Sequence, residues 1–347
     1  MSSVTKYSTC AQAGQFQQIP PSRFSCSILV VRKYRICAGS GEDRVVTNRM
    51  RPGSPVCGNG GGGKPVKIGV LVDCLKLGVK QGIITARDLG FDGVQVYAVT
   101  GEIAPESLSK SGRKEFRDFV AANSLELAAL VGEVGGFDDP ATAAERVDRV
   151  KQVLTLARDL GVPLVTAHIG AVSPDGADPK RKCLIESLKE LGGFGERVEI
   201  FFAVETGMES AAVLKDLLDS LDAEFIKVNY DPANLVMLAG DDPIAGIETL
   251  ADYIVHVHAK DGVRKGTWSL SDLFAEVQKK GRENVRMDDW FAETPLGEGQ
   301  VDIPRFIGAL ARIGYEGFVT IEREAGQDVI QDIVRGRDVI REALAQL

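Results

Sequence analysis

Residues 225–259 read FIKVNYDPANLVMLAGDDPIAGIETLADYIVHVHA, and the fold can be predicted from the unit that they contain. The runs at 225–231 and 253–259 are short and rich in β-branched and aromatic residues, as is typical of buried strands. The segment between them is long enough for a helix. A strand, a helix and a second strand in this order indicate a βα module of a parallel sheet.

The same module recurs along the chain with a period of about 35 residues. Helical segments separate the runs and several end in a glycine, at Gly90, Gly161 and Gly314, which supplies the left-handed residue after a helix. Eight modules favour a closed (β/α)₈ TIM barrel of the α/β class over an open sheet, spanning residues 65–347. The predicted strands lie at 66–72, 93–99, 125–131, 163–169, 199–205, 225–231, 253–259 and 317–323.

Residues 1–64 lack this periodicity and are rich in Ser, Gln, Arg and Gly. We predict a flexible, disordered leader there, because such a composition cannot bury enough apolar surface to fold. It carries nine Lys and Arg against Glu42 and Asp43, a bias seen in organelle transit segments. The alternative is an over-extended start, with Met50 or a later codon as the true beginning.

Charge and composition limit the partners of the barrel. The chain carries a net charge of −8, so with +7 on residues 1–64 the remainder carries −15, which argues against a nucleic-acid partner. No stretch approaches the roughly 18 apolar residues of a membrane helix, so we expect no membrane partner. Only Cys74 and Cys183 fall in the barrel, which favours a reducing compartment such as the cytoplasm. A homo-oligomer is compatible with all of this.

Four metal-ligating residue types stand at the ends of four consecutive predicted strands: Glu205, Asp231, His258 and Glu322. The carboxyl ends of barrel strands meet on one face, where barrel enzymes carry their active sites. Each of the four is embedded in an apolar run, and buried ionised groups need compensation. Three carboxylates and an imidazole suit a divalent cation, Mn²⁺, Mg²⁺, Co²⁺ or Zn²⁺. The sequence therefore predicts a metal site.

Further polar residues lie close to these four in the sequence. His168 ends the fourth strand and could bind a substrate hydroxyl, whereas His256 is more consistent with a core position. Lys260 and Asp261 follow His258 and could orient a substrate or form a solvated pair. Roughly 40 residues separate the seventh strand from its helix, and they include a predicted extra helix at 269–280. Because long βα loops are usually functional, we expect this insertion to cover the substrate.

Several strings resemble the xylose isomerase-like barrel superfamily of sugar phosphate isomerases and epimerases. They are VET (204–206), NYDPANL (229–235), HVHAKD (256–261) and PLGEGQVDIPRFIGALARIGYEGFVTIERE (295–324). The resemblance covers about residues 66–347. It implies that the four strand-end residues are similar to the metal ligands of ketose 3-epimerases.

The resemblance also implies roles for individual residues. Glu205 and Glu322 would serve as acid and base on opposite faces of the substrate, and Arg264 matches an arginine that contacts substrate or a metal ligand. Two positions depart from the pattern of the ketose epimerases. Asn234 stands where they have a substrate-binding histidine, and Ala211 stands where they have an acid that supports the first glutamate.

These features predict a divalent-metal-dependent isomerase or epimerase of a sugar or sugar phosphate. A metal would stabilise the enediolate that forms when a glutamate removes a proton next to a carbonyl. One alternative is a lyase similar to the inosose dehydratases, in which the same intermediate loses a β-hydroxyl group. Another is a barrel that binds a metal or sugar without turnover. The apurinic endonucleases of the superfamily use many more histidines than the three here.

Overall fold

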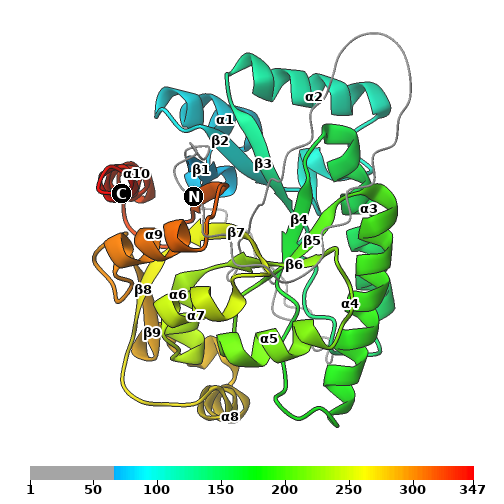
Figure 1. Ribbon diagram of the computed structural model, residues 1–347, viewed down its shortest axis with the longest axis vertical. Helices are drawn as coiled ribbons and strands as arrows, with labels where there is room; N and C mark the ends of the chain where they lie inside the picture. The colour runs from blue at the N-terminus through cyan, green and yellow to red at the C-terminus, as the bar shows by residue number, and fades with distance from the viewer. Residues whose placement is uncertain (1–65) are drawn as a thin grey trace, which may run out of the picture.

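The computed structural model describes residues 66–347, so the predicted leader lies outside the described residues. Eight parallel strands close into a barrel in the order β1-β10-β7-β6-β5-β4-β3-β2 (Figure 1). This confirms the predicted fold class. The barrel strands are β1 (Lys67–Leu71), β2 (Gly93–Tyr97), β3 (Glu126–Val131), β4 (Leu164–Ala167), β5 (Phe201–Glu205), β6 (Ile226–Tyr230), β7 (Ile254–Ala259) and β10 (Phe318–Ile321).

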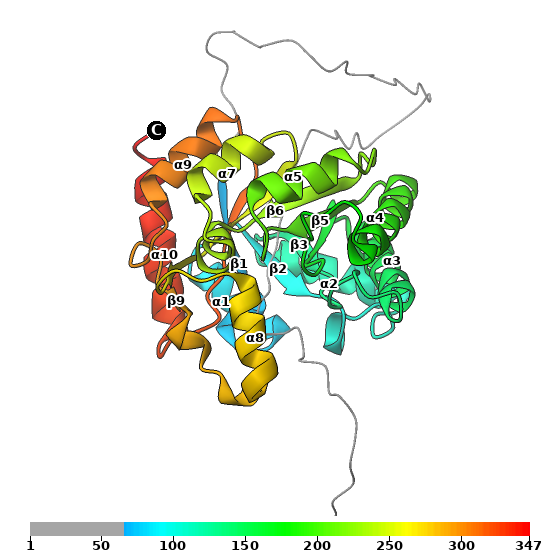
Figure 2. The same ribbon diagram turned by 90° about the horizontal axis from the view of Figure 1, so that it is seen from below.

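Helices connect successive strands and surround the barrel, as the view from below shows (Figure 2). None of the helices between residues 66 and 347 is both long and apolar enough to cross a membrane. The main helices are α1 (Val79–Asp88), α2 (Lys110–Ala122), α3 (Ala143–Leu160), α4 (Pro179–Val198), α5 (Ala211–Asp219), α7 (Pro243–Leu250), α9 (Ile303–Arg312) and α10 (Val329–Leu344).

Glycines of the predicted kind end several helices, and capping residues start others. Gly90, Gly161 and Gly314 all have φ between 70° and 75°, the left-handed region that glycine adopts at little cost. Asp242 accepts hydrogen bonds from the first-turn amides of α7, and Pro243 follows it at the first helical position. These signals fix where each helix turns back toward the sheet.

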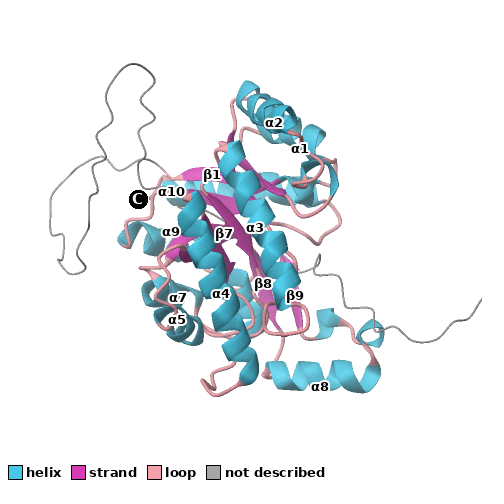
Figure 3. Cartoon of the chain, turned by 90° about the vertical axis from the view of Figure 1, so that its right-hand side faces the viewer, coloured by secondary structure: helices cyan, strands magenta, loops and turns pink. Residues whose placement is uncertain are grey.

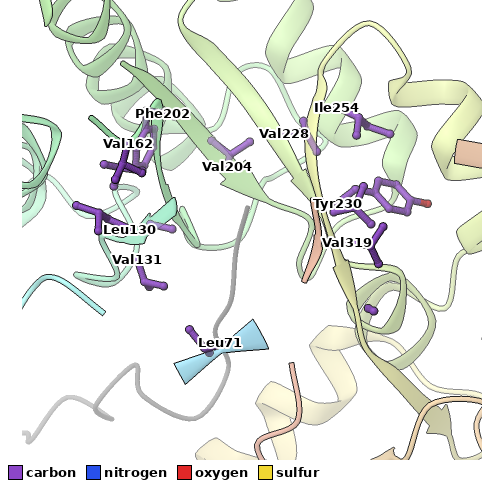
Figure 4. Close-up of a cluster of buried hydrophobic side chains, with 14 of the residues drawn as sticks. Leu71, Leu130, Val131, Val162, Phe202, Val204, Val228, Tyr230, Ile254 and Val319 are labelled. Atoms are coloured by element: carbon purple, nitrogen blue, oxygen red, sulfur yellow. The ribbon is translucent and has the colours of Figure 1, made fainter. Parts of the chain in front are cut away.

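The apolar core fills the space between the strands and the helices. Phe202, Val204 and Val228 are fully buried on this side of the sheet, together with Leu130 and Val319 (Figure 4). Because successive side chains of a strand point to opposite faces, the alternate residues of the same strands point into the barrel. The residues that fill the barrel interior are therefore the alternate positions of each strand, and not those of the apolar core outside it.

The barrel interior changes from apolar to polar along the strands. Phe318 fills the amino-terminal end, where a Cβ added to Gly93 would lie 2.5 Å from its ring. Two residues further along β10, Thr320 is paired with Gly69, where an added Cβ would lie 2.6 Å from its hydroxyl oxygen. Residue 322 follows on the same face. The carboxyl-terminal end of the interior is thus left for charged side chains.

An insertion extends from the seventh strand, as predicted. The antiparallel strands β8 (Asp261–Arg264) and β9 (Phe291–Thr294) form its base, and α8 (Leu270–Lys280) lies at its far end (Figure 3). Ser269 and Asp272 form a reciprocal capping box that starts α8. Trp268 and Trp290 pack edge to face with their ring centroids 5.4 Å apart. The insertion therefore shares a small apolar cluster with the segment that follows β6.

Candidate metal centre

Four acidic or imidazole side chains meet at the carboxyl-terminal end of the barrel interior. Glu205 is the last residue of β5 and His258 lies near the end of β7, while Asp231 and Glu322 directly follow β6 and β10. Those four strands are neighbours in the sheet. The residues two positions earlier on β6, β7 and β10 face the same way and form a buried polar layer beneath: Asn229, His256 and Thr320.

The four side chains are close enough to share one ion. Each offers a ligand atom, and these atoms all lie within 4.8 Å of one another. The Nδ1 atom of His258 is 3.0 Å from Oε2 of Glu322, 3.5 Å from Oδ2 of Asp231 and 3.9 Å from Oε1 of Glu205. All four residues are at most 2% exposed. We refer to Glu205, Asp231, His258 and Glu322 as the quartet.

Burial shifts the protonation of the quartet. It lowers the pKa of His258 to about 4, so the imidazole is neutral at neutral pH, as metal ligation requires. Burial raises the pKa of Glu322 well above its usual value, against the opposing charge of Lys260. Burial also acts to raise the pKa of Asp231, but hydrogen bonding to His258 and the charge of Lys260 outweigh it, and the pKa is lowered.

The donor set of the quartet fits a divalent cation. Three carboxylates within a few ångströms repel one another strongly when they are ionised in a dry interior. Oxygen ligands with one imidazole suit hard or borderline cations such as Mg²⁺ and Mn²⁺. A cation bound between these atoms would offset both the repulsion and the cost of burial. The quartet can therefore hold a divalent metal ion.

Lys260 is the buried ammonium group beside the quartet. It directly follows β7, is 3% exposed, and its Nζ lies 3.1 Å from Oε1 of Glu322 and 3.5 Å from Oε2 of Glu324. The alternative of a solvated Lys260 and Asp261 pair is therefore wrong. The Asp261 carboxylate is also buried and accepts hydrogen bonds from the backbone of the loop at 297–301. Lys260 belongs to the site, whereas Asp261 holds a loop.

Two other predicted substrate-binding residues approach Glu205. Nδ2 of Asn234 donates to Oε1 of Glu205 at 3.2 Å, and Nε2 of His168 lies 3.7 Å from the same oxygen. Asn234 is 1% exposed, whereas the side chain of His168 is 19% exposed. Asn234 therefore hydrogen-bonds to the carboxylate of Glu205, and His168 lies close to it. His256 lies deeper in the barrel, with Nδ1 3.3 Å from the hydroxyl of Tyr315, in agreement with the predicted core position.

Arg264 has a different environment from the one that the resemblance implies. Its guanidinium group lies over the Trp268 ring, 3.7 Å from the centroid, and Nη1 donates to the carbonyl oxygens of Met237 and Leu238 at 2.9 Å. It also donates to the carbonyl of Trp268. These contacts join the insertion to the short helix that follows Asp231. These contacts of Arg264 all lie at the base of the insertion.

A cavity of about 900 Å³ opens next to two residues that contact the quartet. Asn234 and Lys260 line it, and each contacts one glutamate of the quartet. Residues 287–293 of the insertion form one wall, and the loops after β1 and β2 form the other. The insertion, which was expected to cover the substrate, therefore contributes one wall of this cavity.

Three carboxylates near the site, one buried and two partly buried, were not predicted. Glu133 follows β3, and its oxygens accept hydrogen bonds from the backbone amides of Gly135 and His168. Glu324 lies beside Lys260, and Glu293 reaches the barrel from β9. Glu133 and Glu324 stand just past predicted strand ends, a signal that could have identified them. Glu293 lies in the long insertion, where periodicity places no residue relative to the barrel.

Comparisons with known proteins identify one matching family and several curated relatives of low sequence identity. Residues 83–345 match the family described as "Xylose isomerase-like TIM barrel". An inosose dehydratase from Clostridium tetani is 26% identical over 171 residues, which are 47% of this chain and 55% of that enzyme. Relatives from Clostridium beijerinckii and Lacticaseibacillus casei carry the same name. The chain thus spans about half the length of the curated relatives that it matches.

Solved structures share the fold over a longer stretch. A xylose isomerase domain protein from Planctomyces limnophilus matches with a TM-score of 0.65 and 25% identity, over 82% of this chain and 97% of that chain. An L-ribulose 3-epimerase matches with a TM-score of 0.60 at 16% identity, over 81% of this chain and 95% of that chain. At that identity the second likeness shows the fold alone.

Proposed function

The chain belongs to the xylose isomerase-like TIM barrel family, and on this basis we propose that it is a divalent-metal-dependent enzyme acting on a polyhydroxylated carbonyl compound. The observation that carries the proposal is the buried quartet, whose ligand atoms lie within 4.8 Å of one another and whose neighbours Asn234 and Lys260 line a large cavity. A sugar-like substrate is the partner that such a site would take.

The proposed reaction begins with removal of a proton next to the substrate carbonyl. A divalent cation held by the quartet would polarise that carbonyl and lower the barrier by several kcal/mol. Glu205 and Glu322 come from strands separated by two others, so their carboxylates reach the cluster from different sides. One of them would take the proton, which contributes roughly 10²- to 10⁴-fold in rate. Asn234 and Lys260 would hold the two carboxylates in place.

We propose loss of water as the outcome of this first step. In that reaction the intermediate expels a β-hydroxyl group, which takes up a proton as it leaves. Support comes from the names of the curated relatives, several of which are inosose dehydratases. The chain would then be a lyase.

A second outcome, epimerisation or isomerisation, is favoured by the two carboxylates. If Glu205 or Glu322 returned a proton to the opposite face of the same carbon, the product would be an epimer. Return of the proton to the neighbouring carbon would interconvert an aldose and a ketose. Both outcomes use the same site and the same first step.

Deuterium exchange tests the shared step, and product analysis separates the outcomes. The full chain would be incubated in D₂O with Mg²⁺, Mn²⁺ or Co²⁺ and a panel of ketoses and keto-inositols. We expect metal-dependent incorporation of deuterium next to the carbonyl, and a product lighter by one water molecule. A product that retains the elements of water, and differs in mass from the substrate only by the incorporated deuterium, would identify the isomerase or epimerase reaction. No exchange with any compound would overturn the proposal and favour a barrel that binds without turnover.

A further inference from the structure

We infer that the substrate of this site is an uncharged polyhydroxylated ketone and that phosphate esters are excluded. The inference rests on the proposed function and adds the charge class of the substrate. It is carried by the positions of acidic side chains around the cavity. Two places where a barrel of this kind could hold a phosphate group already contain carboxylates.

The first such place is the amino terminus of α10. Barrel enzymes frequently bind phosphate with the loops after the seventh and eighth strands and with a helix amino terminus nearby. Here the Asp328 carboxylate accepts a hydrogen bond from the amide of Gln331 at 3.2 Å, and Asp332 lies in the first turn of the same helix. Two negative charges therefore occupy the end of the helix that would attract an anion.

The second place is Arg323, which directly follows Glu322 after β10. Its Nε and Nη2 atoms lie 3.0 Å from Oδ2 of Asp332, and Nη1 lies 2.8 Å from Oε1 of Glu293. All three side chains are at most 9% exposed. The guanidinium group, which would be the natural ligand for a phosphate, is shared between two buried carboxylates. It is not available to a substrate.

The cations that line the cavity are also offset by acids. Lys260 is held between Glu322 and Glu324. The other basic lining residues are Lys76 and Arg282. Five acidic residues line the same cavity: Asp73, Glu102, Asp288, Glu293 and Glu324. These acids balance the basic residues, so the lining presents no excess of positive charge to an anionic substrate.

One feature on the opposite wall could attract an anion. Helix α1 begins at Gly78, which lines the cavity and has no side chain to cap the first amides. Asp73 and Glu102 line the cavity as well. A hydroxyl group can accept a hydrogen bond from these amides without the repulsion that a phosphate would meet. This helix terminus is therefore better matched to a neutral sugar.

Titration calorimetry of the Mg²⁺-loaded full chain with inorganic phosphate tests the inference without turnover. At constant ionic strength, we expect a dissociation constant above 10 mM. Tighter binding would overturn the inference. In a second arm, the dissociation constant of D-fructose would be compared with that of D-fructose 6-phosphate. A phosphate ester that binds the protein more tightly than the parent sugar would also overturn it.

A variant tests the role of the carboxylates around Arg323. The double substitution Glu293→Gln and Asp332→Asn keeps the size of both side chains and removes both charges. We expect inorganic phosphate to bind this variant at least tenfold more tightly than wild type. Unchanged phosphate binding by a folded variant would contradict the account of Arg323. If the variant does not fold, the wild-type titrations still decide whether the site excludes phosphate.

Absence of deuterium exchange would overturn the proposed function alone, because these titrations measure binding and not turnover.

Discussion

The Nζ atom of Lys260 lies 3.1 Å from Oε1 of Glu322, and both side chains are buried. The two residues directly follow the neighbouring strands β7 and β10, so the sheet itself sets their distance. The pair places a positive charge at the edge of a cluster that carries three carboxylates. Lys260 therefore offsets part of the cost of burying Glu322, and its removal has a predictable effect.

We expect Lys260→Met to lower the free energy of unfolding of the metal-free protein by about 3 kcal/mol, because it leaves a buried carboxylate without its partner. Urea denaturation in the presence of a chelator would measure the change. Lys189→Met, at an exposed position of α4, is the matched control and should change stability by less than about 0.5 kcal/mol. Equal effects of the two substitutions would contradict the assigned ion pair.

Glu322→Gln should reduce turnover by at least about 100-fold, because an amide of the same shape can neither accept the proton nor carry the ligand charge. The rate of deuterium exchange would measure the loss. The circular dichroism spectrum should be unchanged, since the substitution removes a charge from a crowded cluster. Glu316→Gln, at an exposed position before β10, is the isosteric control. Turnover of Glu322→Gln at the wild-type rate would remove its assigned role.

Divalent metal should stabilise the folded protein through Asp231. A ligand that binds only the folded state at 100 times its dissociation constant adds about 2.7 kcal/mol. We expect wild type to gain stability of this order with Mn²⁺, and Asp231→Asn to lose most of the gain. The amide retains an oxygen for the backbone amides of Ala233 and Asn234. The control Asp252→Asn, at an exposed position, should gain as much stability from metal as wild type does. If Asp231→Asn gained as much as wild type, Asp231 would be excluded as a metal ligand.

Arg264 provides a test between a structural role and a substrate contact. Because its donors are used by carbonyl groups at the base of the insertion, we expect Arg264→Met to loosen that segment. Amide hydrogen exchange over residues 265–290 should increase, and KM should rise more than kcat falls. Arg286→Met, whose side chain is 79% exposed, is the control. A fall in kcat with unchanged hydrogen exchange would instead support the contact with substrate or metal.

The fold and the quartet could be predicted because both follow from short-range periodicity. Strand ends such as Glu205 and His258 are marked by apolar runs, and a parallel barrel brings all such ends to one face. The register between neighbouring strands then sets how far along the barrel each residue lies, since Thr320 is paired with His258 and Glu205 with Asn229. No long-range information is needed to place residues that the sheet itself aligns.

Contacts made by the insertion could not be predicted in this way. Glu293 meets Arg323 across 30 residues of sequence, and the sequence between them has no period that fixes their distance. Arg264 stands at the expected spacing after His258, but the Trp268 ring beside it engages its guanidinium group. Spacing along the chain thus identified the residue and not its environment, which depends on how the insertion packs.

The buried carboxyl group of Glu133 should make stability depend on pH. Burial raises its pKa from 4.5 to about 7, against the hydrogen bonds that it accepts from His168 and Gly135. Between these values the unfolded chain is ionised there while the folded protein keeps the proton, so stability falls as pH rises. The shift corresponds to about 3 kcal/mol lost between pH 4.5 and pH 7. Denaturation across this range should show a smaller loss in Glu133→Gln than in wild type. The exposed control Glu145→Gln should follow wild type, and identical pH profiles for all three proteins would exclude a raised pKa at Glu133.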